Sequence, residues 1–355
     1  MSACILGLKR TRLIQHKHSS WRTISTLLRP YRFHIGASWA GKPRDPRVKR
    51  VKSVFPPDSI ILKWKDEQLA RLHKFTWNKD PGEDFFYVQE MREQSGISFG
   101  VADGVGGWAD SGVDPSLFSQ ALMFHAHRYS QHGWAGEPEI DPTQEYEERE
   151  QVEGWEMTPQ ECLGLSYDAV LRERSVLAGS STACLINLNA SSGVLRSASL
   201  GDSGFSIIRS SQVFYRQQPQ THFFNCPKQL TKLPSGSRRY SNSAVDQPDD
   251  AEVYETRLRD GDIVVVYTDG LSDNVFPSEI ISICALVARQ MEGQKSDDEQ
   301  AQTMANQIVE YAKLCMHNKQ RVSPFERAAA REEMYFRGGK IDDVTVIVAL
   351  VREAA

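Results

Sequence analysis

The pattern of apolar and polar residues along the chain predicts short strands and amphipathic helices. Runs enriched in β-branched and aromatic residues predict strands over residues 85–89, 97–102, 182–188, 194–200, 204–209 and 212–215. Two stretches that are almost wholly apolar predict strands buried on both faces, at residues 263–268 and 344–351. Apolar residues at helical spacing predict helices over residues 114–129, 159–177, 277–292 and 298–317.

The order of these elements indicates an α+β fold. Turn residues such as Gly193 and the pair Asp202-Ser203 separate successive strands by only a few residues. This spacing favours an antiparallel meander, because a parallel crossover needs a dozen residues or more. A run of strands, followed by two helices and a returning strand, predicts one layered α+β domain.

The first 44 residues differ in composition from the rest of the chain. They contain nine Lys or Arg residues and no Asp or Glu, and Arg22 and Arg29 lie among apolar residues at helical spacing. An amphipathic, acid-free segment of this kind is typical of mitochondrial targeting, with the matrix as the destination. The alternative is a disordered basic tail that binds an acidic partner. We therefore assign residues 1–44 to a targeting segment and linker, and residues 45–355 to a folded domain.

The folded part is acidic, and its composition argues against nucleic-acid binding. Downstream of residue 44, acidic residues outnumber basic ones by 13, which disfavours a phosphate backbone as a partner. Nine acids against one Arg predict a solvated acidic insertion over residues 131–158. No apolar run approaches the ~20 residues that span a bilayer, so no stable membrane span is expected. The six cysteines show no metal-binding spacing.

Acidic residues recur beside the predicted strands. Four dipeptides with this placement are Glu83-Asp84, Asp103-Gly104, Asp269-Gly270 and Asp342-Asp343. Each one alone is explained by turn chemistry. Together they predict carboxylates gathered at one end of a sheet, where each pair at ~4 Å repels by about 4 kcal/mol at a dielectric near 20. Such a cluster requires cations, and two hard ions such as Mg²⁺ or Mn²⁺ would both fit an all-oxygen site and activate water for attack on phosphorus.

Several motifs resemble those of the type-2C metal-dependent protein serine/threonine phosphatases. Residues 99–108, FGVADGVGGW, are similar to the strand and DG-x-GG signature of that family. The other landmarks stand in the family's order, at 82–84 (GED), 180–183 (SSTA), 200–203 (LGDS), 268–273 (TDGLSD) and 342–345 (DDVT). The match covers roughly residues 55 to 352, and DGVGGWADSGVDP and DGLSDNVF look most like the mitochondrial branch.

The resemblance implies a four-layer sandwich of two antiparallel β-sheets flanked by α-helices. It also implies that residues 45–355 are a catalytic domain that hydrolyses phosphoserine and phosphothreonine with water activated by two Mg²⁺ or Mn²⁺ ions. Asp103, Asp269 and Asp342 are the implied catalytic residues, and Asp103 would bridge both ions. Asp269 and Asp342 would complete one metal site, and Glu83 with the Gly104 carbonyl would serve the other.

Four features depart from the family's pattern. Asp273 matches a ligand of a weaker third metal site, but the other carboxylate expected there falls near Leu177. Val105 stands where many members have a His that protonates the leaving alkoxide, which predicts slow turnover. Lys79 replaces the usual phosphate-binding Arg, and it either binds phosphate as a point charge or is an ordinary solvated lysine. Asp343 replaces an Asn, so Asp342 is the expected ligand of the pair.

Two functions remain open from the sequence. The first is an active phosphatase whose implied partners are phosphoprotein substrates, among them mitochondrial metabolic or quinone-biosynthesis enzymes. The alternative is a catalytically weak or dead type-2C domain that acts as a binding scaffold. The absent His and Arg favour the scaffold, whereas the retained acids favour the enzyme, because a scaffold has no need of uncompensated carboxylates.

Overall fold

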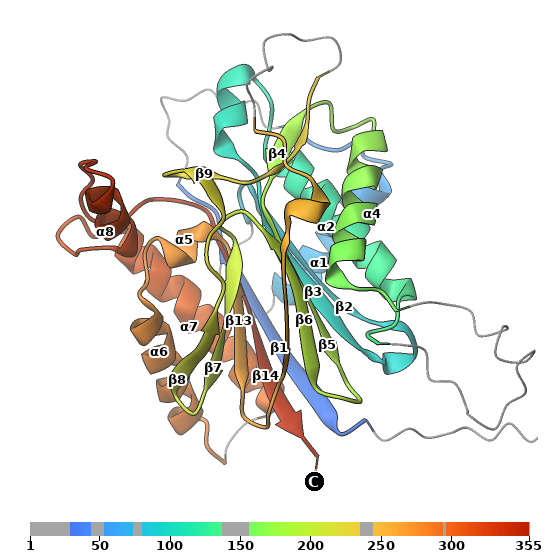
Figure 1. Cartoon of the computed structure of the whole chain (residues 1–355), viewed down its shortest axis with the longest axis vertical. Helices are drawn as coiled ribbons and strands as arrows, with labels where there is room; N and C mark the ends of the chain where they lie inside the picture. Colours follow the sequence, from blue (N-terminus) through green and yellow to red (C-terminus); the bar gives the residue numbers. More distant parts are fainter. Residues whose placement is uncertain are drawn as a thin grey trace, which may run out of the picture.

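The computed structural model describes residues 29–43, 53–73, 80–136, 156–234, 244–293 and 296–354. Two five-stranded sheets lie face to face, and helices cover the outer face of each sheet (Figure 1). All the strand pairs within these two sheets are antiparallel. The predicted four-layer α+β sandwich is therefore confirmed.

The first sheet contains the two strands that the sequence marks as buried on both faces. Its strands, in spatial order, are β1 (Tyr31–Ala40), β14 (Val344–Glu353), β13 (Ile263–Tyr267), β7 (Gly204–Arg209) and β8 (Gln212–Arg216). Its outer face packs against α6 (Pro277–Gln290) and α7 (Asp297–His317). Val264 and Val266 face the other sheet, whereas Val265 faces these helices, so every residue of this stretch lies among apolar side chains.

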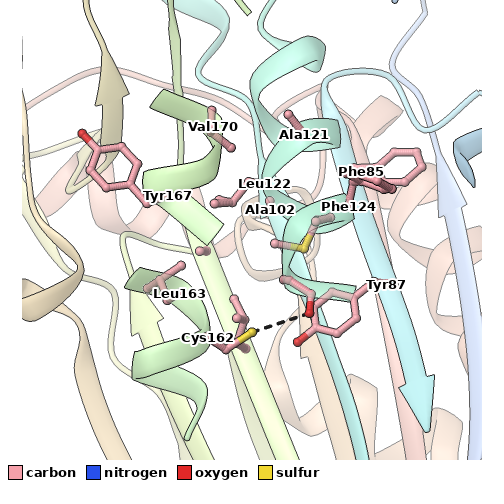
Figure 2. Packing of buried hydrophobic residues seen from close by; sticks show 14 of the residues in the cluster. Phe85, Tyr87, Ala102, Ala121, Leu122, Phe124, Cys162, Leu163, Tyr167 and Val170 are labelled. Carbon is pink, nitrogen blue, oxygen red and sulfur yellow. Dashed lines mark hydrogen bonds between the residues drawn. The ribbon is translucent and has the colours of Figure 1, made fainter. Parts of the chain in front are cut away.

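The second sheet lies under a separate helical layer. Its strands, in spatial order, are β12 (Glu252–Arg257), β6 (Val194–Leu200), β5 (Ala183–Asn189), β3 (Gly96–Asp103) and β2 (Asp84–Glu90). The helices on its outer face are α1 (Ile60–His73), α2 (Ser116–His132) and α4 (Pro159–Arg172). Figure 2 shows Phe85 and Tyr87 of β2 in one apolar cluster with Leu122 of α2 and Leu163 of α4, which lies on the far side of the cluster. This cluster fixes α2 over the strands whose ends carry the acidic residues.

A third apolar cluster holds the two sheets together. Trp39 of β1 packs on Phe86 of β2 with ring centroids 5.0 Å apart, and both side chains are buried. Phe99 and Phe205 belong to the same cluster. Burial of each such aromatic side chain contributes about 1.5–3 kcal/mol, so the relative placement of the sheets is well determined.

The structure corrects the domain boundary that composition suggested. β1 lies within residues 1–44, yet it pairs with β14 along its whole length, from Tyr31↔Glu353 to Ala40↔Val344. The folded domain therefore includes β1, and the boundary between residues 44 and 45 falls too late. The strand escaped detection because Arg32 and His34 interrupt its apolar pattern, and because Gly36, required by the close approach of the α7 backbone, is unfavourable in strands. Residues 1–28, the core of the predicted targeting segment, lie outside the described residues.

Several shorter elements complete the fold and were not predicted. They are α5 (Asp269–Ser272), α8 (Pro324–Arg331), β4 (Gly179–Ser181), β9 (Thr221–Phe223), β10 (Cys226–Pro227), β11 (Leu230–Lys232) and three 3₁₀ turns, η1 (Arg92–Gln94), η2 (Gly106–Ser111) and η4 (Pro248–Asp250). Most of the predicted acidic insertion, residues 137–155, lies outside the described residues. None of the described helices combines the length and apolar character that crossing a bilayer requires.

Candidate active site

The acidic residues singled out by the sequence meet where ends of both sheets come together. Asp103 ends β3 and pairs in register with Asp84 at the start of β2. Asp269 begins α5 directly after β13, and Asp342 precedes β14. The Thr268 amide donates to the Thr345 carbonyl at 3.2 Å, so the ends of β13 and β14 are held side by side.

Backbone contacts fix Asp103 and the following glycine. The Asp103 carbonyl accepts hydrogen bonds from the Thr182 amide at 3.0 Å and from Ser181 Oγ at 2.8 Å. The Gly104 amide donates to the Glu83 carbonyl at 3.1 Å. A Cβ on Gly104 would lie only 2.6 Å from the Pro115 carbonyl oxygen, so only glycine fits there. The DG pair thus anchors the β3 end against the Glu83 turn.

A network of carboxyl groups surrounds two lysine ammonium groups at this end of the sandwich. Ion pairs or direct electrostatic interactions link eight acids: Glu83, Asp84, Asp103, Asp202, Asp269, Asp273, Asp342 and Asp343. The two cations are Lys42, which follows β1, and Lys340, which precedes β14. Acids outnumber bases, so the cluster carries excess negative charge or bound protons.

Each ammonium group bridges several carboxylates. Lys340 Nζ lies 2.6 Å from Asp269 Oδ2, 2.7 Å from Asp273 Oδ2 and 3.3 Å from Asp342 Oδ2. Lys42 Nζ lies 2.7 Å from Glu83 Oε2 and 3.1 Å from Asp342 Oδ1. Asp342 therefore contacts both cations, and the three expected ligands Glu83, Asp269 and Asp342 belong to one connected group.

Asp343 has a different environment from its neighbour Asp342. Its Oδ1 accepts from the Lys42 amide at 2.7 Å, and its Oδ2 accepts from the Glu83 amide at 3.0 Å. Burial raises the pKa of Asp343 to about 6, although Lys42 opposes the change. Both of its oxygens therefore accept from backbone amides and hold two turns together, whereas the choice of Asp342 as the ligand of the pair stays a prediction.

Crowding of buried acids perturbs their protonation. Burial, reinforced by the Asp269 charge, raises the pKa of Asp103 well above its usual range. Burial also raises the pKa of Asp84, with a contribution from Asp343, and the pKa of Asp202, with a contribution from Asp269. These shifts report carboxyl groups whose charged forms are stabilised by too few cations.

The positive charge of Lys340 acts to lower the pKa values of the carboxyl groups around it. Burial acts to raise the pKa of Asp269, but Lys340, together with Asp103 and Lys42, outweighs it, so the pKa is lowered. Burial raises the pKa of Asp273 to about 7, with Lys340 opposing the change and Asp269 adding to it. Burial would lower the pKa of Lys340, yet the three surrounding carboxylates raise it well above its usual range. Lys340 therefore remains charged throughout the physiological range.

The chemistry of the cluster fits divalent cations. Among the residues that the structure describes, Asp202 Oδ1 is buried without a hydrogen-bond partner, and Asp269 Oδ1 has none beyond the neighbouring Asp103 carboxyl. Unpaired buried carboxylate oxygens are what Mg²⁺ or Mn²⁺ would coordinate. Within the described part of the chain, no three His, Cys, Asp or Glu side chains are arranged around a common point as ligands. Ammonium groups instead lie among the carboxylates, so metal binding requires local rearrangement of these side chains.

The structure brings together six of the seven predicted site residues. They are Glu83, Asp103, Gly104, Asp269, Asp273 and Asp342. Lys79 lies outside the described residues, so its role stays a prediction. No site role was predicted from the sequence for Lys42, Lys340 or Asp202. Asp202 was recognisable in the GDS turn and Lys340 by its place two residues before Asp342, whereas Lys42 had no signal beyond its charge.

Comparison with known proteins agrees with this geometry. No family model matches the chain. The chain is 37% identical over 315 residues to the protein phosphatase PTC7 homolog fig of Drosophila willistoni, and the match covers 88% of each chain. It is 35% identical over 275 residues to the human protein phosphatase PTC7 homolog, covering 77% of this chain and 80% of the human one.

A solved structure shares the fold across nearly the whole chain. The photosystem II phosphatase PBCP superposes with a TM-score of 0.59 and 25% identity, and the match covers 90% of this chain and 98% of that one. The same family is indicated by the sandwich fold, by the carboxylates at its end and by identities above 30% over most of the sequence. The chain therefore belongs to the type-2C family of metal-dependent protein serine/threonine phosphatases and is similar to its PTC7 members.

Proposed function

We propose that the protein hydrolyses phosphoserine and phosphothreonine in mitochondrial phosphoproteins, with two divalent cations held at the end of the sandwich. The observation that carries this proposal is the convergence of Asp103, Asp269 and Asp342 from both sheets, where a buried oxygen of Asp269 lacks an adequate donor. Clustered acids of this kind are tolerated only where cations compensate them. Family membership supports the reaction class.

The proposed ligands are the residues that the structure gathers. Asp103 is suited to contact both ions because it lies between the β2–β3 side of the cluster and Asp269. Asp269 and Asp342 would hold one ion, and Glu83 with the Gly104 carbonyl would hold the other. When bound, two Mg²⁺ or Mn²⁺ ions would supply an activated water and neutralise phosphate charge.

The chain's own residues limit the rate of the proposed reaction. The Val105 side chain has no ionisable proton to donate, so the leaving alkoxide would take its proton from solvent. Lys79 would neutralise the substrate phosphate as a point charge, with less geometric control than a bidentate Arg. We therefore expect a phosphatase with modest turnover that depends chiefly on its metal ligands.

A matched pair of variants tests the reaction. The full chain with Mn²⁺ should hydrolyse p-nitrophenyl phosphate and a phosphothreonine peptide, and Asp103→Asn should lower kcat by at least about 100-fold, since removing a transition-state electrostatic contact has effects of this size. Asp260→Asn is the control, because Asp260-Gly261 is also an Asp-Gly pair but is exposed at the opposite end of β13. Equal activity in wild type and Asp103→Asn would refute the proposed mechanism.

The mitochondrial location rests on composition. The acid-free, Arg-rich start of the chain supports targeting, and substrates would then be mitochondrial metabolic enzymes, including those of quinone biosynthesis. Any removable segment would have to end before Tyr31, because cleavage beyond it would remove part of a strand paired with β14. Residues 1–30 fused to a fluorescent protein should localise to mitochondria, and a diffuse cytosolic signal would refute this part of the proposal.

A second candidate function is a catalytically weak or dead scaffold. The observation that favours it is the presence of two ammonium groups among the expected ligands, together with Val105 in place of a proton donor. A scaffold would bind Mn²⁺ weakly or not at all and would bind phosphoproteins without turnover. A Mn²⁺-dependent rate that Asp103→Asn abolishes would exclude it.

A further inference from the structure

Lys340 occupies a distinctive place within the acidic cluster. Its ammonium group contacts the carboxylates of Asp269 and Asp273 at 2.6 and 2.7 Å, and that of Asp342 at 3.3 Å. The Lys340 side chain is only 18% exposed, and those of its two closest partners are 10% and 23% exposed. Three carboxylates around one shielded cation is an arrangement that a divalent ion would otherwise satisfy.

Hydrogen bonds between Asn274 and the backbone of Lys340 hold this lysine in position. The Lys340 amide donates to Asn274 Oδ1 at 2.8 Å, and Asn274 Nδ2 donates to the Lys340 carbonyl at 2.9 Å. Asn274 is fully buried and also bonds to the Gly270 carbonyl. These contacts fix the strand-entry segment so that the Lys340 side chain enters the cluster.

An aromatic ring covers the outer side of the ammonium group. Lys340 Nζ lies 5.0 Å from the ring centroid of Phe325, which is buried at the start of α8. The Phe325 amide donates to the Asp273 carbonyl at 3.0 Å, so the same residue holds the backbone of Asp273. Figure 1 shows α5 and α8 close to one another at this end of the sandwich. A cation–π contact adds to the stability of a cation in this place.

We propose that the Lys340 ammonium is a built-in cation that holds Asp269 and Asp273 in place of an additional divalent ion, and so limits how many ions the centre binds. Lys340 acts as a positioning residue, because it orients carboxylates and does not contact the phosphate. Asp273, which matches a ligand of a third metal site, is in this chain a partner of Lys340. The inference rests on the proposed metal centre, and it adds a prediction of how many divalent ions that centre binds.

Lys42 provides a useful contrast within the same cluster. Its ammonium group contacts Glu83, Asp342 and Asp343, and it does not share Asp269 or Asp273 with Lys340. The two lysines share Asp342 and otherwise compensate different carboxylates, Glu83 and Asp343 for Lys42 and Asp269 and Asp273 for Lys340. Removal of Lys340 should expose Asp269 and Asp273 to metal while the contacts of Lys42 stay as they are.

The test is the number of Mn²⁺ ions bound by the full chain, counted from the electron paramagnetic resonance signal of free Mn²⁺ during titration of metal-free protein. Lys340→Met should bind one more ion per chain than wild type. Lys319→Met is the control, because Lys319 also lies over an aromatic ring, 5.5 Å from that of Phe336, but among the described residues it bonds to the Gly339 carbonyl and to no carboxylate. It should bind the wild-type number.

A double variant keeps the test decisive if Lys340→Met folds poorly without metal. Lys340→Met combined with Asp273→Asn removes one positive and one negative charge, so it should fold without metal and bind the wild-type number of ions. The proposal is overturned if Lys340→Met binds the same number of ions with the same affinity as wild type, or if the double variant is as unstable as the single one. Wild type that binds no Mn²⁺ would instead contradict the proposed metal centre itself.

Discussion

Thr268 Oγ1 donates a 2.7 Å hydrogen bond to Asp84 Oδ2 at the point where the ends of the two sheets meet. Thr268 follows β13 of the first sheet, and Asp84 begins β2 of the second, 184 residues away in sequence. Both residues are fully buried. The same hydroxyl accepts from the Thr345 amide at 3.0 Å, so one side chain joins three strands beneath the acidic cluster.

Replacing this threonine should weaken both the fold and the site. Thr268→Val keeps the shape but leaves Asp84 and the Thr345 amide short of a partner, which lowers the free energy of unfolding by about 1–3 kcal/mol. Urea unfolding in the presence of a chelator measures the change. Thr256→Val in the edge strand β12 is the control and should stay within about 0.5 kcal/mol of wild type. Equal stability of the two variants would show that the contact between the sheets contributes nothing.

The sheet interiors were predictable because burial on both faces leaves a local signal. β13 and most of β14 read as almost wholly apolar runs, and the strands of the meander show β-branched enrichment between turn residues. β1 could not be found this way. Its polar residues resemble the basic segment around it, and its strand character depends on pairing with β14, more than 300 residues later.

The acids of the site were predictable for a similar reason. Asp103 and Asp269 come directly after apolar strands, so their placement at strand ends follows from the local pattern. The two lysines were not predicted. Lys340 stands two residues before Asp342, which places it near the site, but its burial, like that of Lys42, cannot be told from local sequence. Lys42 reaches Glu83 because it directly follows β1, and β1 pairs with β14 at the edge of the first sheet. That pairing is a property of the tertiary fold.

Gly82 should be irreplaceable because of its backbone conformation and because the Asp343 carboxylate lies against it. Its φ is +75°, and a Cβ there would collide with the Asp343 carboxylate. Gly82→Ala should therefore destabilise the fold by roughly 2–4 kcal/mol and displace Asp343 from the Glu83 amide. Gly261 has a φ of +78° but open space around it. Gly261→Ala should lose only about 1–2 kcal/mol, so the difference between the variants in urea unfolding isolates the collision.

Divalent metal should stabilise the fold through the crowded acids. Mn²⁺ at 100 times its dissociation constant should raise the free energy of unfolding by about 2.7 kcal/mol for one site, since the ion binds the native state only. Asp103→Asn should lose most of this gain while remaining folded, because the pKa of Asp103 is already raised by burial and the neutral amide suits the metal-free site. Thermal unfolding with Mn²⁺ and with chelator measures both effects. A metal-induced shift that survives Asp103→Asn would place the bound ions elsewhere.

His125 should make the fold sensitive to mild acid. Its side chain is buried in α2, its Nε2 has no hydrogen-bond partner in the described part of the chain, and the ring packs edge-on against Phe124 with centroids 5.1 Å apart. Burial lowers the pKa of His125 to about 4, with Arg128 and Arg172 adding to the effect and Glu173 opposing it. The unfolded chain has its ordinary value near 6.5, so between pH 6.5 and 4 the unfolded state binds the proton and the native state does not.

Stability should therefore fall as the pH decreases through this window. His125 accounts for a loss of about 2 kcal/mol between pH 7.5 and 5. His125→Gln cannot take up a proton, so its unfolding free energy should fall by that much less than wild type over the same range. The carboxylates of the acidic cluster titrate equally in both proteins, and the comparison thus removes their contribution. A His125→Gln variant that kept the wild-type pH dependence would show that the His125 side chain takes up its proton as readily in the native state as in the unfolded state.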